Sequence, residues 1–179
     1  MSKDGMGQAE IGHIRVSQST STRFFLDTNI AVYCFDSSEP RKQNRAKDLV
    51  AHAASSGLGV VSYQVLQEFC NVATNAKRLL LTTEQIMAYT TQLLEPMNKV
   101  APSVELLALA LQIRQDTHYA FYDSLIIASA QLSGCGTLYS EDMHHHQLVG
   151  GVRITNPFLD VANEPEADRQ VPVFTKSKI

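Results

Sequence analysis

The sequence contains few of the residues that are typical of disulfide-rich, fibrous or disordered proteins. It has no tryptophan, three cysteines, nine glycines and six prolines among 179 residues. The cysteines are widely spaced and odd in number, and no pair has zinc-ligand spacing, which argues against a disulfide framework or a cysteine-based zinc centre. Hydrophobic residues at 44% and charged residues at 18% are typical of a globular chain that buries a core of its own.

The sequence also has neither a large net charge nor a long apolar run. Both features restrict how it could interact with nucleic acid or a membrane. The net charge is −3, which argues against a protein that coats nucleic acid through bulk positive charge. The first twenty residues have no apolar central stretch and do not resemble a signal peptide, and no run approaches the roughly 18 apolar residues of a membrane span. We therefore expect a cytoplasmic protein that does not associate with a membrane.

The composition changes near both ends of the chain. Residues 1–22 are polar and lack periodicity, so we interpret them as a flexible N-terminal segment. Residues 160–179 contain few apolar side chains and are interpreted as a polar C-terminal tail. The folded domain is therefore expected over residues 23–159.

Short apolar runs alternate with helical stretches inside this domain. Strands are expected at 23–26, 58–61, 137–140 and 152–154, and helices at 40–56, 63–79, from 82 to a point before Pro96, 102–117 and 122–133. This alternation, with short strands that are apolar throughout, predicts an α/β domain of three layers, α/β/α, around a central parallel sheet.

Two aspartates directly follow expected strands. Asp27 comes after the strand at 23–26, and Asp142 comes after the strand at 137–140. Because sites in open parallel sheets form outside the carboxyl ends of the strands, we expect both side chains at the same edge. A role as a helix cap or turn residue is the alternative for each one taken alone.

Two further acids lie on expected helices. Glu68 follows Val65 by three residues and precedes Val72 by four, so it borders the buried stripe and aligns with Gln64 in a polar strip. A carboxylate there is costly unless it is paired or bound to metal, and a salt bridge to Lys or Arg is the alternative. Asp123 opens the most apolar helix, where capping of free N–H groups would also explain it.

If the four acids converge, electrostatics restricts their chemistry. Carboxylates within a few Å repel one another and raise one another's pKa values. A divalent cation removes this conflict, and ligation by oxygen alone selects Mg²⁺ or Mn²⁺ over zinc. Such a site activates a water and stabilises charge that develops on a phosphodiester. We therefore expect metal-dependent phosphodiester hydrolysis.

Four motifs follow one another along the chain: Phe24–Asn29, Gln67–Phe69, Tyr122–Ala130 and Leu138–Asp142. Taken in order they resemble the PIN domain, and within it the VapC-type toxins of bacterial toxin–antitoxin pairs. The ending Ile154–Phe158 is similar to that of one branch of the family. Each motif alone is weak, whereas the ordered set over about residues 23–158 is specific. The resemblance implies an Mg²⁺-dependent endoribonuclease that slows translation until a cognate antitoxin, encoded nearby, binds it. It also implies a homodimer.

The resemblance also implies roles for particular residues. The matching acids surround Mg²⁺ in that family, with Asp27 and Asp123 as direct ligands and Glu68 and Asp142 as ligands directly or through water. The residues that match the supporting shell are Thr28, Asn29 and Ser140.

Some assignments stay open in the sequence. Glu141 adjoins Asp142 and could take its role. Lys77 and Arg78 lie beyond Glu68 on the same expected helix and are candidates for holding substrate phosphates, with a solvated helix end as the alternative.

Two other functions share features with this sequence. A phosphatase of the haloacid dehalogenase type also begins with a strand and an aspartate, but it needs a second aspartate where Asn29 stands. The other is a catalytically degenerate PIN module that only binds RNA or a protein partner. The presence of all four acids argues against it, because a retired site has no use for carboxylates that repel one another.

Overall fold

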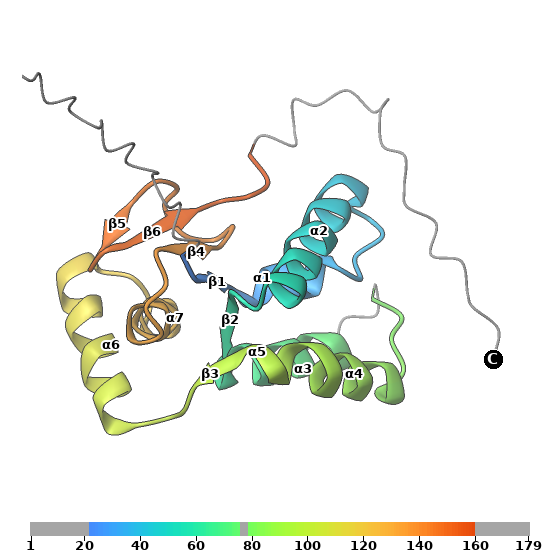
Figure 1. The fold of residues 1–179 in the computed structure, drawn as a ribbon, viewed down its shortest axis with the longest axis horizontal. Coiled ribbons are helices and arrows are strands. Elements are labelled where there is room, and N and C mark those ends of the chain that lie inside the picture. The colour runs from blue at the N-terminus through green and yellow to red at the C-terminus, as the bar shows by residue number, and fades with distance from the viewer. Residues whose placement is uncertain (1–21, 76–78, 160–179) are drawn as a thin grey trace, which may run out of the picture.

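Six strands form one sheet in the computed structural model, which describes residues 22–75 and 79–159 of the chain. The spatial order is β3-β2-β1-β4-β6-β5 (Figure 1), and the strands are β1 (Phe24–Leu26), β2 (Gly59–Ser62), β3 (Asn98–Val100), β4 (Thr137–Tyr139), β5 (Leu148–Val149) and β6 (Val152–Thr155). The predicted segments 1–22 and 160–179 lie outside the described residues, apart from Thr22.

The sheet is mostly parallel, as predicted. β1 lies at its centre and pairs in parallel with β2 on one side and β4 on the other. The pairs β2–β3 and β4–β6 are also parallel, whereas β5 runs antiparallel to β6 at one edge. Every residue of β1 and β2 is buried, as expected of parallel strands that are covered on both faces.

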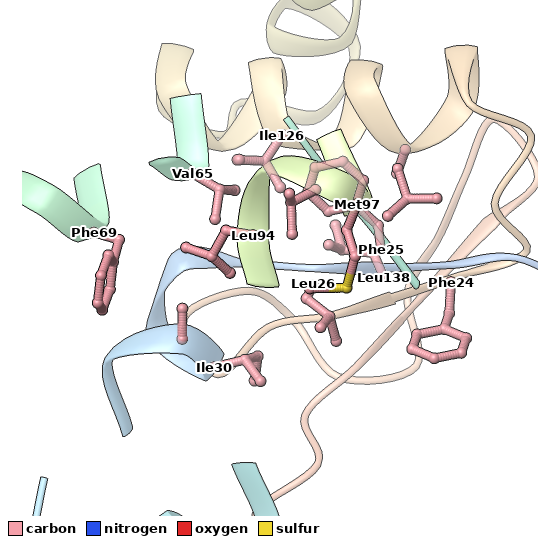
Figure 2. Packing of buried hydrophobic residues seen from close by; sticks show 14 of the residues in the cluster. Phe24, Phe25, Leu26, Ile30, Val65, Phe69, Leu94, Met97, Ile126 and Leu138 are labelled. Atoms are coloured by element: carbon pink, nitrogen blue, oxygen red, sulfur yellow. The ribbon is translucent and has the colours of Figure 1, made fainter. Parts of the chain in front are cut away.

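Helices cover both faces of the sheet, which confirms the predicted three layers. On one face α7 (Phe121–Leu132) packs against β2, β4 and β6, and α6 (Val104–Thr117) packs against α7 (Figure 1). On the other face the Phe24 ring stacks on His52 of α2 (Pro40–Ser56), with 5.5 Å between centroids. Figure 2 shows Phe24 and Phe25 on opposite sides of the sheet, with Phe25 on the side of Ile126.

Local sequence explains where the main helices begin and end. Pro40 occupies the first turn of α2, where its missing N–H costs no bond, and Gly57 ends that helix at a left-handed φ of 67°. Ser103 caps α6 by accepting a hydrogen bond from the Leu106 N–H, and Thr82 forms a capping box at the start of α4. The remaining helices are α1 (Thr28–Tyr33), α3 (Tyr63–Asn75), α4 (Thr83–Tyr89), a π-helical turn η1 (Thr90–Leu94) and α5 (Glu95–Met97).

The prediction that the helix starting at residue 82 ends before Pro96 is wrong. The helical segment continues through η1 into α5, which contains Pro96 and ends at Met97. In the π-helical turn the Glu95 N–H donates to the Thr90 carbonyl, and Pro96 then occupies the first turn of α5, where a missing donor is tolerated.

Other boundaries also differ from the prediction. The helix expected over 63–79 is α3, which ends at Asn75; residues 76–78 lie outside the described residues, and Leu79 lies in a turn. Strands β3 and β5 were not predicted, because they have three and two residues and are too short for a periodic signal. No helix in the described part of the chain is both long enough and apolar enough to cross a membrane.

Candidate active site

Asp27 stands at the carboxyl end of the central strand and begins α1. Its backbone N–H donates to the Tyr139 carbonyl of β4 at 3.0 Å, so β1 and β4 end side by side. As the N-cap of α1, the side chain accepts at Oδ1 from the Thr28 N–H at 2.7 Å. Oδ2 accepts from the Ser140 hydroxyl at 2.7 Å and from the Asn29 amide at 3.4 Å. Capping is thus one role of Asp27, and it leaves the second oxygen turned toward β4.

The Asp27 carboxyl has a perturbed acidity. Burial raises its pKa from 3.8 to about 6, and the hydrogen bonds from Ser140 and Thr28 offset only part of that rise. The nearby charges of Glu68 and Asp142 raise the pKa further. The side chain is only 8% exposed, so its negative charge is carried in a place that water hardly reaches.

Glu68, on the second turn of α3, is held by neutral donors at both oxygens. The Thr28 hydroxyl donates to Oε2 at 2.6 Å, and the Gln64 amide donates to Oε1 at 2.7 Å. The alternative role predicted for Glu68, a salt bridge to Lys or Arg, is not found among the described residues. Glu68 therefore has no ion-pair partner in the described part of the chain.

The Asn29 side chain donates hydrogen bonds to two acids, each of which follows a strand. Its amide nitrogen donates to Oδ2 of Asp142 at 3.1 Å and to Oδ2 of Asp27 at 3.4 Å. The backbone N–H of Asp142 donates to the Ser140 hydroxyl at 3.3 Å, which fixes the loop that follows β4. The opposite oxygen of the Asn29 amide, Oδ1, is buried and has no hydrogen-bond partner among residues 22–75 and 79–159.

Glu141 points to a different partner from its neighbour Asp142. It forms an ion pair with Lys42 of α2 at 2.5 Å, and Lys42 also donates to the Tyr33 hydroxyl at 3.1 Å. The side chain of Asp142, in contrast, is the one bound by Asn29. The geometry therefore favours Asp142 over Glu141 as the acid of the cluster.

Asp123 lies in the first turn of α7, three residues after the N-cap, Ala120. Its carboxylate accepts no hydrogen bond from the described residues, so side-chain capping does not explain its position. Burial raises the pKa of Asp123, and repulsion by Asp142 and then by Glu68 raises it further. The same two acids act on Asp27. The four predicted acids therefore share one electrostatic environment at the carboxyl edge of the sheet.

The cluster has the chemical composition of a site for a hard divalent cation. All its potential ligands are oxygens, and no Lys or Arg of the described residues forms an ion pair with any of the four acids. Within residues 22–75 and 79–159, however, no three Asp, Glu, His or Cys side chains already stand in an arrangement that would hold a metal ion. Protein donors engage oxygens of two of the acids, since Thr28 and Gln64 donate to Glu68 and Asn29 donates to Asp142.

Two predicted site residues are not described, and one residue that was not predicted contacts the acids. Lys77 and Arg78 lie outside the described residues. Gln64, noted in the sequence only as part of a polar strip, contacts Glu68 directly and also donates to the Tyr122 carbonyl at 3.3 Å. Its spacing of four residues from Glu68 was the signal that could have identified it.

The fold and the acid cluster together define a class: a mostly parallel α/β domain that gathers carboxylates at the carboxyl ends of its strands. The PIN domain family model matches residues 24–150, a stretch that contains all four acids, and the chain therefore belongs to the PIN domain family. Domains of this family are generally metal-dependent nucleases that bind RNA. A search of curated proteins finds no match to this chain.

Proposed function

We propose that the chain is an Mg²⁺- or Mn²⁺-dependent endoribonuclease, and that it acts in the cytoplasm as the toxin of a toxin–antitoxin pair. One observation carries the enzymatic part of this proposal. Two acids with raised pKa values, Asp27 and Asp123, both face Glu68 and Asp142, and no described Lys or Arg neutralises them. Such an arrangement is costly in the absence of a cation and useful in its presence.

Each acid has a proposed task in holding the cation. By the family resemblance Asp27 and Asp123 would be direct ligands. The Asp123 carboxylate accepts no hydrogen bond from the described residues, and the Asp27 carboxylate is oriented by donors at both oxygens. Glu68 and Asp142 would bind directly or through water. The supporting residues would orient them: Ser140 and Asn29 act on Asp27, Thr28 on Glu68, and Asn29 also on Asp142.

A divalent cation in this place supplies an activated water and stabilises the charge that develops on a phosphodiester. Ligation by carboxylate oxygen favours Mg²⁺ or Mn²⁺ over softer metals. To bind it, the carboxylates of Glu68 and Asp142 must turn from the amides that hold them. Lys77 and Arg78 are the proposed contacts of the chain to the phosphates of the substrate.

The biological assignment rests on the family resemblance of the motifs. On this basis we propose that the substrate is RNA, that the partner is a cognate antitoxin encoded nearby, and that the protein is a homodimer. The second candidate function is a catalytically degenerate module that binds RNA or protein. The charge on the acid cluster disfavours it, because a module without a cation would be more stable with these acids replaced.

The decisive experiment is an RNA cleavage assay with purified protein in Mg²⁺, Mn²⁺ or EDTA. We expect internal cleavage that depends on the metal and falls by at least a hundredfold in Asp123→Asn. Asp116→Asn is the matched control, because Asp116 is an exposed acid of α6 that bonds only to Gln112 in the described chain. Cleavage that persists in EDTA or in Asp123→Asn would refute the enzymatic assignment. Growth arrest on expression, relieved by the neighbouring gene, tests the toxin role separately.

A further inference from the structure

Asp142 differs from the other three acids of the cluster in the kind of segment that carries it. Asp27 is the N-cap of α1, Glu68 lies on α3 and Asp123 lies on α7, so a regular element fixes the position of each backbone. Asp142 lies in the β4–β5 loop (residues 140–147), an irregular segment, and it is exposed there. Side chains on loops are placed less precisely than those on helices and strands unless other residues hold the loop.

The contact that holds the Asp142 carboxylate cannot hold it in the same way once a cation is bound. The Asn29 amide donates to Oδ2 of Asp142 at 3.1 Å. When Asp142 turns from this amide toward a cation, as proposed above, its position depends on its backbone. The accuracy with which the acid reaches the cation then depends on the residues that anchor the β4–β5 loop.

Asn156, the first residue after β6, anchors this loop on both sides of Asp142. Its side-chain nitrogen donates to the Glu141 carbonyl at 3.4 Å, and its backbone N–H donates to Nδ1 of His145 at 3.0 Å. Its side-chain oxygen accepts from the Phe158 N–H at 2.9 Å. Because a backbone N–H can only donate, this last bond fixes the orientation of the amide and turns its nitrogen toward the loop.

The anchor is itself held by packing against α1 and α2. Phe158 is buried, and its ring meets that of Tyr33 edge to face, with 5.0 Å between centroids. Lys42 of α2 lies over the Phe158 ring at 5.8 Å and forms the ion pair with the Glu141 side chain. Glu141 is therefore held by α2 at its carboxylate and by Asn156 at its carbonyl, immediately before the acid of the cluster.

We propose that Asn156 is a positioning residue for metal binding, because it holds the β4–β5 loop where Asp142 can reach the cation of the acid cluster. This inference rests on the metal-dependent function proposed above. Asn156 is neutral and its two donors bond to Glu141 and His145, so it acts on the cation through geometry and not through charge. It also gives a role to the ending Ile154–Phe158, which the sequence marks only by resemblance.

Asn156→Ala tests this role without changing any charge. In EDTA, hydrogen exchange followed by NMR should become roughly tenfold faster at the Asp142 and His146 amides, which donate to the Ser140 hydroxyl and the Ile154 carbonyl. Amides in the middle of α7 should keep their wild-type rates. An EPR titration without RNA should show Mn²⁺ bound about tenfold more weakly. A high Mg²⁺ concentration should then restore most of the RNA cleavage.

Ser103→Ala is the matched control for a general loss of stability. Like Asn156, Ser103 accepts a nearby backbone N–H, that of Leu106 at 3.1 Å. It makes no hydrogen bond to the acids or to the β4–β5 loop in the described chain. We expect Ser103→Ala to change neither the exchange rates of the loop nor the affinity for Mn²⁺.

Asn156→Asp is the second variant, for use if Asn156→Ala does not fold. It keeps an acceptor for the Phe158 N–H and replaces the donor to the Glu141 carbonyl by an oxygen. Its added negative charge would by itself tighten the binding of a cation, whereas the loss of position loosens it. We expect weaker Mn²⁺ binding, and equal or tighter binding would contradict the positioning role.

The outcomes separate this role from the ribonuclease assignment. Wild-type Mn²⁺ affinity or wild-type loop exchange in Asn156→Ala would overturn the positioning role, and the ribonuclease assignment would stand if the protein still cuts RNA. An equal loss of affinity in Ser103→Ala would also overturn it. Weaker Mn²⁺ binding in Asn156→Ala, together with no RNA cleavage by the wild type, would support the positioning role and refute the ribonuclease. A wild-type protein that binds no Mn²⁺ would refute both.

Discussion

Replacing Asp27 by asparagine should stabilise the protein in the absence of metal, although Asp27 is proposed to be essential for activity. Its pKa rises from 3.8 to about 6 on folding. A shift of about 2 units corresponds to roughly 3 kcal/mol of destabilisation at pH 7.5, at about 1.36 kcal/mol per unit. Asparagine has the same shape without the charge, so this cost disappears in Asp27→Asn.

Part of the gain is lost because an amide cannot accept hydrogen bonds at its nitrogen. The Asp27 oxygens accept from the Thr28 N–H and the Ser140 hydroxyl. The amide oxygen can serve Thr28, and the Ser140 hydroxyl can rotate to accept from the amide nitrogen. Losing a charged acceptor still costs about 1–2 kcal/mol. The net gain in unfolding free energy is then about 1–2 kcal/mol, or a rise of roughly 2–8 °C in Tm.

The assay is urea unfolding followed by circular dichroism in EDTA, with Asp116→Asn as the control that should not move. The pH dependence is part of the prediction. Because the folded pKa of Asp27 lies above the unfolded one, the native state takes up a proton first as the pH falls through about 6. The wild-type cost therefore falls to roughly half by pH 5, and the advantage of Asp27→Asn shrinks with it. A variant less stable than wild type at pH 7.5, or an advantage independent of pH, would refute this reasoning.

Three further predictions concern the metal, the core and the loop after β4. The Mg²⁺ concentration for half-maximal cleavage should rise by up to ~10-fold per pH unit below about 6, because protonated Asp27 must lose its proton to bind; a titration at pH 5 to 8 checks this, and a flat profile would contradict it. Gly59→Ala should destabilise the fold by about 3 kcal/mol in urea unfolding, because a Cβ there would lie 2.2 Å from the Cβ and 2.8 Å from the Cα of Ala53. Lys42→Gln and Glu141→Gln should show a coupling of about 1 kcal/mol in a double-mutant cycle, and a coupling of zero would mean that the pair does not hold the loop.

The topology of the site was predictable because it follows from parallel pairing. Asp27 and Asp142 are 115 positions apart in the chain, by their numbers, yet each follows a strand and the two strands are neighbours. The alternation of apolar runs and helices predicts parallel strands. Because parallel strands end at the same edge of the sheet, the two side chains lie at that edge. Their role in catalysis stays a prediction.

The details that the sequence did not disclose depend on contacts between distant segments. The choice between Asp142 and Glu141 depends on Lys42, which lies 99 positions away from Glu141 and engages it in an ion pair. The second contact of Gln64 is a carbonyl 58 positions away, which no helical periodicity indicates. Strand β3 contains exposed Lys99 and intermediate Asn98, so it has the composition of a loop and becomes a strand only by pairing with β2.

The choice of neutral donors around the acids links stability to metal loading. A lysine near Glu68 or Asp142 would cancel the repulsion, but it would also occupy the position where a cation must bind. Hydroxyls and amides orient the same carboxylates and leave their charge in place. The cost at Asp27, about 3 kcal/mol and caused mainly by burial and only in part by repulsion, is a sizeable share of the roughly 5–15 kcal/mol that stabilises a domain. Since a bound cation would remove that cost, the protein should be distinctly more stable with metal than without it, and the fully buried strands β1 and β2 must supply the difference in its absence.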